Sequence, residues 1–104
     1  MGIGKLEFAS IEKTVSAITP KFSVLVLASL FQTRTGRGFN ALLKELPAIT
    51  PRTLSQRLKE LEQKGLISKN ISMGTRIRIE YRLTDRGFVF EDALNGMAGT
   101  GAKL

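Results

Sequence analysis

The sequence contains no cysteine and no histidine. Without cysteine there is no disulfide, no thiolate nucleophile and no thiol-based redox sensor, and without histidine the commonest catalytic base and metal ligand is missing. Only scattered carboxylates remain as strong metal ligands, so we expect no metal site and no cofactor. The chain also has no nucleophile beside a base, no phosphate loop followed by lysine and no paired carboxylates. We therefore expect no catalytic residue and no enzymatic activity.

Long hydrophobic runs are also missing. The longest apolar run extends only from Phe22 to Phe31, about half the length that a membrane-spanning helix needs. It follows the charged residues Glu12, Lys13 and Lys21, which does not fit a secretion signal. The expected location is the cytoplasm, without a membrane partner.

Positive charge, in contrast, is plentiful. The chain has 16 Lys and Arg residues against 9 Asp and Glu residues, a net charge of +7. Residues 50–86 hold nine of the basic and four of the acidic side chains, a net +5, which leaves +2 for the rest of the chain. Such an excess favours a polyanionic partner, either nucleic acid or an anionic membrane surface.

Apolar periodicity and turn residues predict one mainly α domain over residues 1–104, with a small β-hairpin (α+β). Its expected parts are an N-terminal helix over 5–19, a core over 20–83, a C-terminal helix over 84–95 and a flexible tail over 96–104. Within the core we expect helices at about 21–32, 39–46 and 50–64 and a hairpin over 66–83. Two short helices joined by a tight turn and followed by a hairpin form a winged helix-turn-helix.

The helix over 50–64 has the clearest signals. Thr50-Pro51 supplies a cap and a first-turn proline, Leu54, Leu58 and Leu61 share one face, and Gly65 ends the helix. Its opposite face carries long polar donors that suit base edges in a major groove, beside Ser and Thr hydroxyls that suit phosphates. The expected DNA-contacting residues are Arg52, Thr53, Ser55, Gln56, Arg57 and Lys59. The alternative is an ordinary amphipathic helix with a solvated polar face.

The second hairpin strand alternates regularly. Its apolar residues (Ile77, Ile79, Tyr81, Leu83) are expected to face inward and its polar ones (Arg76, Arg78, Glu80, Arg82) outward. The DNA-binding residues expected in this wing are Lys69, Arg76 and Arg78. Alternatively, the arginines only keep a sheet edge soluble.

Apolar residues at spacings of three, four and three mark the first helix. This stripe is as narrow as a seam between two helices, so it packs either on its own domain or on a second copy. We expect a homodimer interface that also uses the last helix, formed by Phe8, Ile11, Val15, Ile18, Phe88, Phe90 and Leu94.

The chain also resembles a known family. Residues 39–67, with the string Ile49-Thr-Pro-Arg-Thr-Leu-Ser-Gln-Arg-Leu58, resemble the helix-turn-helix of HxlR-type regulators. Residues 78–87, with Glu-Tyr-Arg-Leu-Thr, resemble the strand that leads into the family's last helix. Residues 20–27 are similar to its Gly-Lys-Trp segment, with Phe22 where tryptophan is usual. MarR-type winged helices share only the looser pattern over 61–67.

The resemblance implies a prokaryotic regulator that is joined as a dimer through its first and last helices and represses or activates a nearby gene. Many family members respond through a cysteine near the N-terminus, which this chain lacks. The effector is therefore unknown. We expect sequence-specific binding to double-stranded DNA, to a palindromic operator in the nucleoid. The alternatives are a winged helix that docks on an acidic protein and a non-specific architectural nucleic-acid binder.

Overall fold

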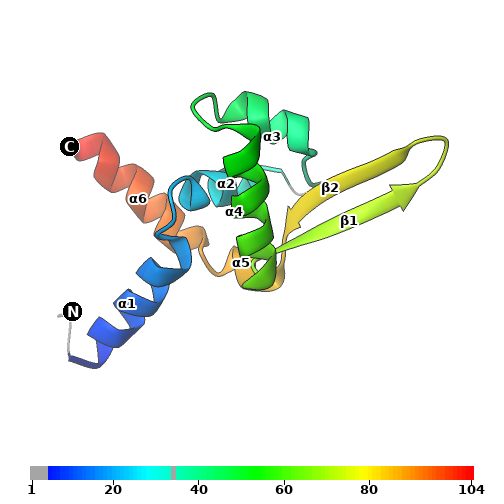
Figure 1. Cartoon of the computed structure of the whole chain (residues 1–104). Coiled ribbons are helices and arrows are strands. Elements are labelled where there is room, and N and C mark those ends of the chain that lie inside the picture. Colours follow the sequence, from blue (N-terminus) through cyan, green and yellow to red (C-terminus); the bar gives the residue numbers. More distant parts are fainter. Residues whose placement is uncertain (1–4, 34) are drawn as a thin grey trace.

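The structure is a computed structural model that describes residues 5–33 and 35–104. Its elements run α1 (Lys5–Ile18), α2 (Ser23–Phe31), α3 (Phe39–Glu45), α4 (Pro51–Gln63), β1 (Ile67–Met73), β2 (Ile77–Leu83), α5 (Asp85–Phe88) and α6 (Glu91–Lys103). Figure 1 shows the hairpin on one side of α4 and the two terminal helices on the other. The predicted mainly α fold with a small antiparallel hairpin is confirmed.

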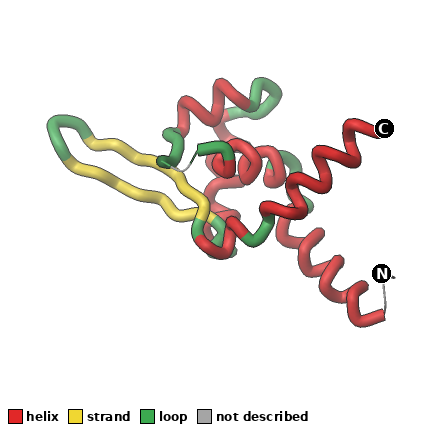
Figure 2. The backbone as a smooth tube through the Cα atoms, turned by 180° about the vertical axis from the view of Figure 1, so that it is seen from behind, coloured by secondary structure: helices red, strands yellow, loops and turns green. Residues whose placement is uncertain are grey.

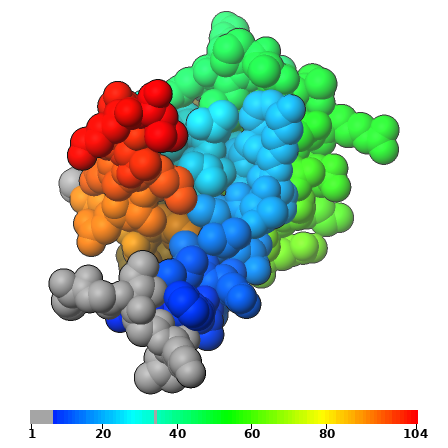
Figure 3. Space-filling model, turned by 90° about the vertical axis from the view of Figure 1, so that its left-hand side faces the viewer, coloured from blue at the N-terminus to red at the C-terminus, as the bar shows by residue number. Residues whose placement is uncertain are grey.

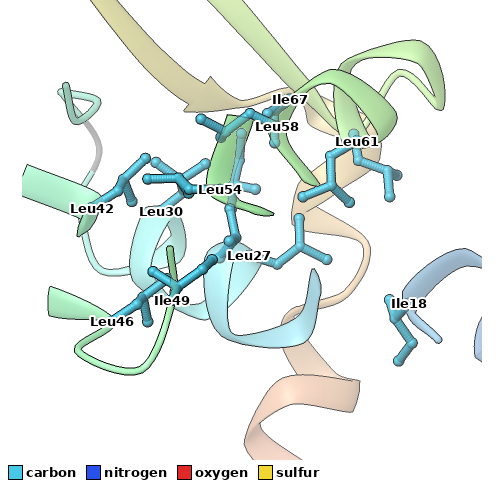
Figure 4. Close-up of a cluster of buried hydrophobic side chains, with 13 residues drawn as sticks. Ile18, Leu27, Leu30, Leu42, Leu46, Ile49, Leu54, Leu58, Leu61 and Ile67 are labelled. Atoms are coloured by element: carbon cyan, nitrogen blue, oxygen red, sulfur yellow. The ribbon is translucent and has the colours of Figure 1, made fainter. Parts of the chain in front are cut away.

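The core lies between α2, α3, α4 and the base of the hairpin (Figure 4). Leucine side chains dominate it, because each helix turns one leucine stripe inward. Fully or almost fully buried are Val26, Leu27, Leu30, Leu42, Leu54, Leu58, Leu61, Leu66 and Ile67. This shared core fixes α4 against α2, so its polar face must point outward.

Helix α4 begins and ends as its sequence predicts. The Thr50 hydroxyl accepts a hydrogen bond from the Thr53 amide at 3.1 Å, and Pro51 occupies the first turn. Gly65 has a φ of 75°, a left-handed conformation that favours glycine at a helix C-terminus. Side-chain capping of this kind typically stabilises a helix by about 1 kcal/mol.

The loop before α3 anchors the base of the hairpin. Arg37 and Tyr81 exchange two backbone hydrogen bonds, of 2.9 and 2.8 Å, so the loop extends the sheet by one bridge. The Arg37 guanidinium also pairs with the Glu45 carboxylate, which accepts a second hydrogen bond from Ser29 at 2.9 Å. Gly36 has a φ of 92°, and a Cβ there would lie 2.7 Å from the Arg82 side chain. These contacts hold one end of the wing rigidly on the core.

The outer half of the hairpin corrects one expectation. The strands pair in register from Ile67–Leu83 at the base to Met73–Ile77 at the tip. The base pair is buried, whereas Met73 is 82% exposed and Ile77 68% exposed, so the apolar face predicted to point inward is solvent-exposed beyond the base. The physical reason is length, because the ribbon projects past the core that would cover it (Figure 2).

The C-terminal segment also differs from what the sequence predicts. The single helix expected over 84–95 is two helices, and the tail expected over 96–104 belongs to α6, which continues to Lys103. Gly87 lets α5 pack closely on the segment before β1, because a Cβ at this position would lie 2.2 Å from the Leu66 carbonyl oxygen. The apolar stripe of Phe90 and Leu94 continues through Met97 at helical spacing, and extending an existing helix is easier than starting one.

Candidate nucleic-acid interface

The outward face of α4 is built by the leucines on its other side. Since Leu54, Leu58 and Leu61 are buried, the residues half a turn away must face solvent. The structure exposes four of the six residues predicted to contact DNA on this helix: Arg52, Ser55, Gln56 and Lys59. They fall in the first three turns, the part of a recognition helix that contacts base edges.

Thr53 and Arg57 are placed differently from those four residues. The Thr53 hydroxyl lies 3.0 Å from that of Thr50, inside the capping interaction. Arg57 donates two hydrogen bonds to the Glu60 carboxylate, of 2.5 and 2.9 Å, and its side chain is only 15% exposed. The ion pair neutralises Glu60, one of the two carboxylates on this helix that would repel phosphate. Glu62 is exposed nearer the C-terminus of the helix.

The wing presents its cations on more than one face. Lys69, Arg76 and Arg78 are all exposed. Arg78 pairs with Ser72 across the ladder, on the polar face, whereas Lys69 pairs with Tyr81 on the face that carries the apolar residues. Arg76 lies in the turn. A projecting ribbon of this kind can reach a polyanion from its tip or from its polar face.

The terminal helices diverge from the core as two arms, α1 and α6 (Figures 1 and 2). Each arm continues an apolar stripe that begins in the core. On α1, Ile18 is buried, while Phe8, Ile11 and Val15 are 45–59% exposed. On α6, Leu94 packs against the core and Met97 is exposed.

Three of the residues predicted for the dimer interface therefore serve the chain's own core. Ile18 belongs to it outright, and Phe90 and Leu94 are partly buried against it. Phe88 stacks edge-on against Phe31, with ring centroids 5.7 Å apart. Phe8, Ile11 and Val15 remain available for a partner.

Leu25 and Met97 are among the exposed apolar residues near the arms that sequence reasoning missed. Leu25 on α2 is half-exposed although most of its neighbours in the apolar run are buried, and Met97 was assigned to a flexible tail. The spacing of Phe90, Leu94 and Met97 was the signal that identifies Met97. The surfaces of α1, α2 and α6 lie side by side on the face shown in Figure 3.

In the part of the chain that the structure describes, no single helix is long and apolar enough to cross a membrane. Helices α1 and α2 together have the length and composition for a bent pair, but α2 is largely buried in the core. No three potential metal ligands gather among the same residues.

Relatives of the chain are transcriptional regulators. It is 38% identical over 77 residues to the HTH-type transcriptional regulator YvaP of Bacillus subtilis, covering 73% of this chain and 68% of the relative. It is 37% identical over 94 residues to an HTH-type transcriptional regulator of Synechocystis, covering 88% and 67%. Regulators of this type bind DNA and are not enzymes, in agreement with the missing catalytic motifs.

Solved structures show the same fold. A transcriptional regulator of the MarR family from Enterococcus faecalis V583 superposes with a TM-score of 0.82 at 31% identity, covering 99% of this chain and 90% of that one. The oxidised form of the redox regulator HypR superposes with a TM-score of 0.83 at 25% identity, covering 91% and 96%. The model of the HxlR-like helix-turn-helix family matches residues 6–104. The chain belongs to the HxlR-like helix-turn-helix family and is a DNA-binding transcriptional regulator.

Proposed function

We propose that this regulator binds a palindromic operator in double-stranded DNA as a homodimer. Helix α4 of each protomer lies in the major groove, and the wing contacts the backbone or the minor groove. Binding takes place in the cytoplasm, at the nucleoid. The observation that carries this proposal is the outward face of α4, where Arg52, Gln56 and Lys59 are exposed together on a helix fixed by its leucine core.

The side chains on this face suit different parts of a duplex. Gln56 has the paired donor and acceptor that recognise adenine, and Arg52 has the paired donors that recognise guanine. Lys59 and the exposed wing arginines suit phosphate oxygens, which position a protein without reading sequence. One helix face with both kinds of group favours specific binding over purely electrostatic binding.

The arms supply the reason for a dimer. Burying a large apolar side chain stabilises an association by about 1.5–3 kcal/mol, and Phe8, Ile11 and Val15 are available on each chain. Part of this gain offsets the cost of immobilising two bodies, so contributions from α6 are also needed. A two-fold axis would place two α4 helices about 34 Å apart, in successive major grooves.

Fluorescence anisotropy with labelled duplexes tests the specific contact. Gln56→Ala should weaken operator binding by about 1–3 kcal/mol and relax the preference at one base pair. Gln63→Ala, at the C-terminal end of the same helix, is the matched control and should change little. If wild-type protein binds every duplex equally weakly at moderate salt, the specific-binding proposal is wrong and a non-specific binder is favoured.

A salt titration separates base contacts from backbone contacts. Arg78→Ala should weaken binding to operator and random DNA alike and reduce the slope of log affinity against log salt by about one. Gln56→Ala should leave that slope unchanged. If Arg78→Ala has the same slope as the wild type on both operator and random DNA, Arg78 makes no backbone contact and this part of the proposal is wrong.

A further inference from the structure

The outer half of the hairpin carries an exposed apolar patch. Its members form two neighbouring ladder pairs on one face, Ile71 with Ile79 and Met73 with Ile77. Ile71 is 59% exposed and Ile79 42%, and these fractions rise to 82% and 68% in the pair at the tip. We call these residues the wing patch. Contiguous apolar side chains in this position indicate an interaction surface.

The wing patch lies on a narrow support that projects from the molecule. Figure 1 shows the ribbon extending away from α3 and α4, with its turn at the free end. Met73 lies six residues beyond Ile67, the buried residue at the base of β1, and this length of strand spans about 20 Å. The tip can therefore enter a groove that is too narrow for the core.

The charges around the wing patch all have one sign. Lys69, Arg76 and Arg78 are exposed on the same part of the hairpin, and residues 67–79 contain no Asp or Glu. A matching partner surface is apolar in its middle and anionic at its edges. The minor groove of DNA has both properties, because sugars form its walls and phosphates line its two rims.

A protein partner fits the wing patch less well. A stable protein interface covers about 800 Å² on each partner, which is more than four partly exposed side chains on one ribbon supply. Contact between the wing patches of two copies would also bring their arginines and lysines together, and repulsion between like charges opposes this. The exposed stripe on α1 differs, because that helix carries carboxylates (Glu7, Glu12) as well as cations.

We propose that Met73 and Ile77 form an apolar wedge that enters the minor groove and kinks the duplex. The groove is about 6 Å wide, whereas two paired strands lie about 4.8 Å apart before their side chains are counted. The tip therefore fits only where the groove opens. Apolar side chains inserted at a base step open it by unstacking the bases, which bends the duplex by about 20–90°. This inference rests on the proposed binding of the wing to DNA.

The wedge adds a second kind of sequence recognition to the one proposed for α4. Helix α4 presents donors and acceptors to base edges, whereas a wedge senses how easily a base step unstacks. Pyrimidine–purine steps such as TA and CA are kinked at the lowest cost. We therefore expect an operator of this protein to have such a step under each wing, at equal distances from its centre.

Energy transfer between dyes at the two ends of a short duplex tests the wedge. One duplex is selected with wild-type protein from a random-sequence pool, and an unselected duplex of the same length is compared with it. Energy transfer should rise when wild-type protein saturates the duplex, because a kink of about 20–90° brings the ends together. Met73→Ser combined with Ile77→Ser should still bind through α4 but should lose this rise. Met73→Leu combined with Ile77→Val keeps an apolar tip and should bend the duplex as the wild type does.

Fluorescence anisotropy of the same samples shows whether each variant is bound, and circular dichroism shows whether it is folded. Wild-type protein that binds without a rise in energy transfer would overturn the wedge. A serine variant that bends the duplex as much as the wild type does would also overturn it. If wild-type protein sediments as a dimer and the serine variant as a monomer, the wing patch is a contact between two copies and the proposal is wrong.

The two duplexes separate failure of the wedge from failure of the proposed operator binding. If the selection enriches no sequence, operator binding is wrong, whereas a rise in energy transfer on the unselected duplex that the serine variant lacks still supports the wedge. If wild-type protein binds neither duplex, both proposals are overturned.

Discussion

The winged core and the two arms contain the same kind of apolar stripe, yet the stripes are buried differently. In α4, Leu54, Leu58 and Leu61 are at most 2% exposed because α2 and β1 cover them. In α1, Phe8 and Val15 are more than half exposed, although their spacing is just as regular. The difference lies in what surrounds each helix, since the arms extend beyond the core (Figure 2).

This comparison separates two kinds of information in a sequence. Spacing along the chain predicts a helix and which of its faces is apolar. It does not tell whether the same chain or another one covers that face. In our account the core stripes stabilise the monomer fold, and the arm stripes stabilise the association of two chains. Substitutions in the two regions should therefore affect different measurements.

The largest effect on folding is expected in the core. Leu54→Ala should lower the free energy of unfolding by about 2–5 kcal/mol, because it removes buried contacts and leaves a cavity. Urea denaturation followed by circular dichroism, at one protein concentration, measures the change. A loss well below this range would show that the core around Leu54 is looser than its complete burial indicates.

The arm should respond in the opposite way. Ile11→Asp combined with Val15→Asp should leave the helical circular dichroism signal of the core but prevent association, because the charges would be buried at the seam. Because the dimer is lost, operator affinity should also fall strongly. Ser10→Asp combined with Ser16→Asp adds the same charge to α1 away from the seam, and these residues should leave association intact. Equal behaviour of the two double variants would remove α1 from the interface.

A smaller effect is expected on the second arm. Met97→Asp places one charge on the exposed continuation of the α6 stripe and should weaken association less than the double change on α1. Asn95→Asp, an exposed polar position in the same helix, is the control. Sedimentation across a range of concentrations gives the dimer dissociation constant of each variant. If Met97→Asp has the same dimer dissociation constant as the wild type, Met97 is not part of the interface.

The smallest effect belongs to the tip of the hairpin. Ile77→Ala should change the free energy of unfolding by less than about 0.5 kcal/mol, as exposed sites generally do. Ile67→Ala, on the same face at the buried base, should cost about 2–5 kcal/mol. The two variants have the same substitution on the same face of the hairpin. If both lower the free energy of unfolding equally, the side chain at the tip is buried like the one at the base.

The sequence was sufficient to predict α4 and its surroundings. Thr50, Pro51 and Gly65 are local signals, and their geometry in the structure follows from short-range sterics and capping. The order of helices and hairpin followed from periodicity, and the outward residues of α4 followed from its leucines. The DNA contacts themselves, at the α4 and wing residues, stay predictions.

Long-range contacts account for what sequence reasoning did not predict. Nothing local distinguishes Ile77 from Leu83, because their burial depends on how far the core extends. The bridge of Arg37 to Tyr81 joins segments distant in the chain, and the pairing of Arg57 with Glu60 depends on side-chain conformation. The helical C-terminus was misjudged because its glycines outweighed a continuing apolar stripe.

Sedimentation equilibrium of the wild-type chain, alone and with a palindromic operator duplex, tests the central claim most directly. The account predicts about twice the chain mass of 11.4 kDa for the free protein at micromolar concentration. It also predicts two chains per duplex, bound cooperatively. A free protein that sediments as a monomer and still binds one palindrome tightly as a single chain would contradict it.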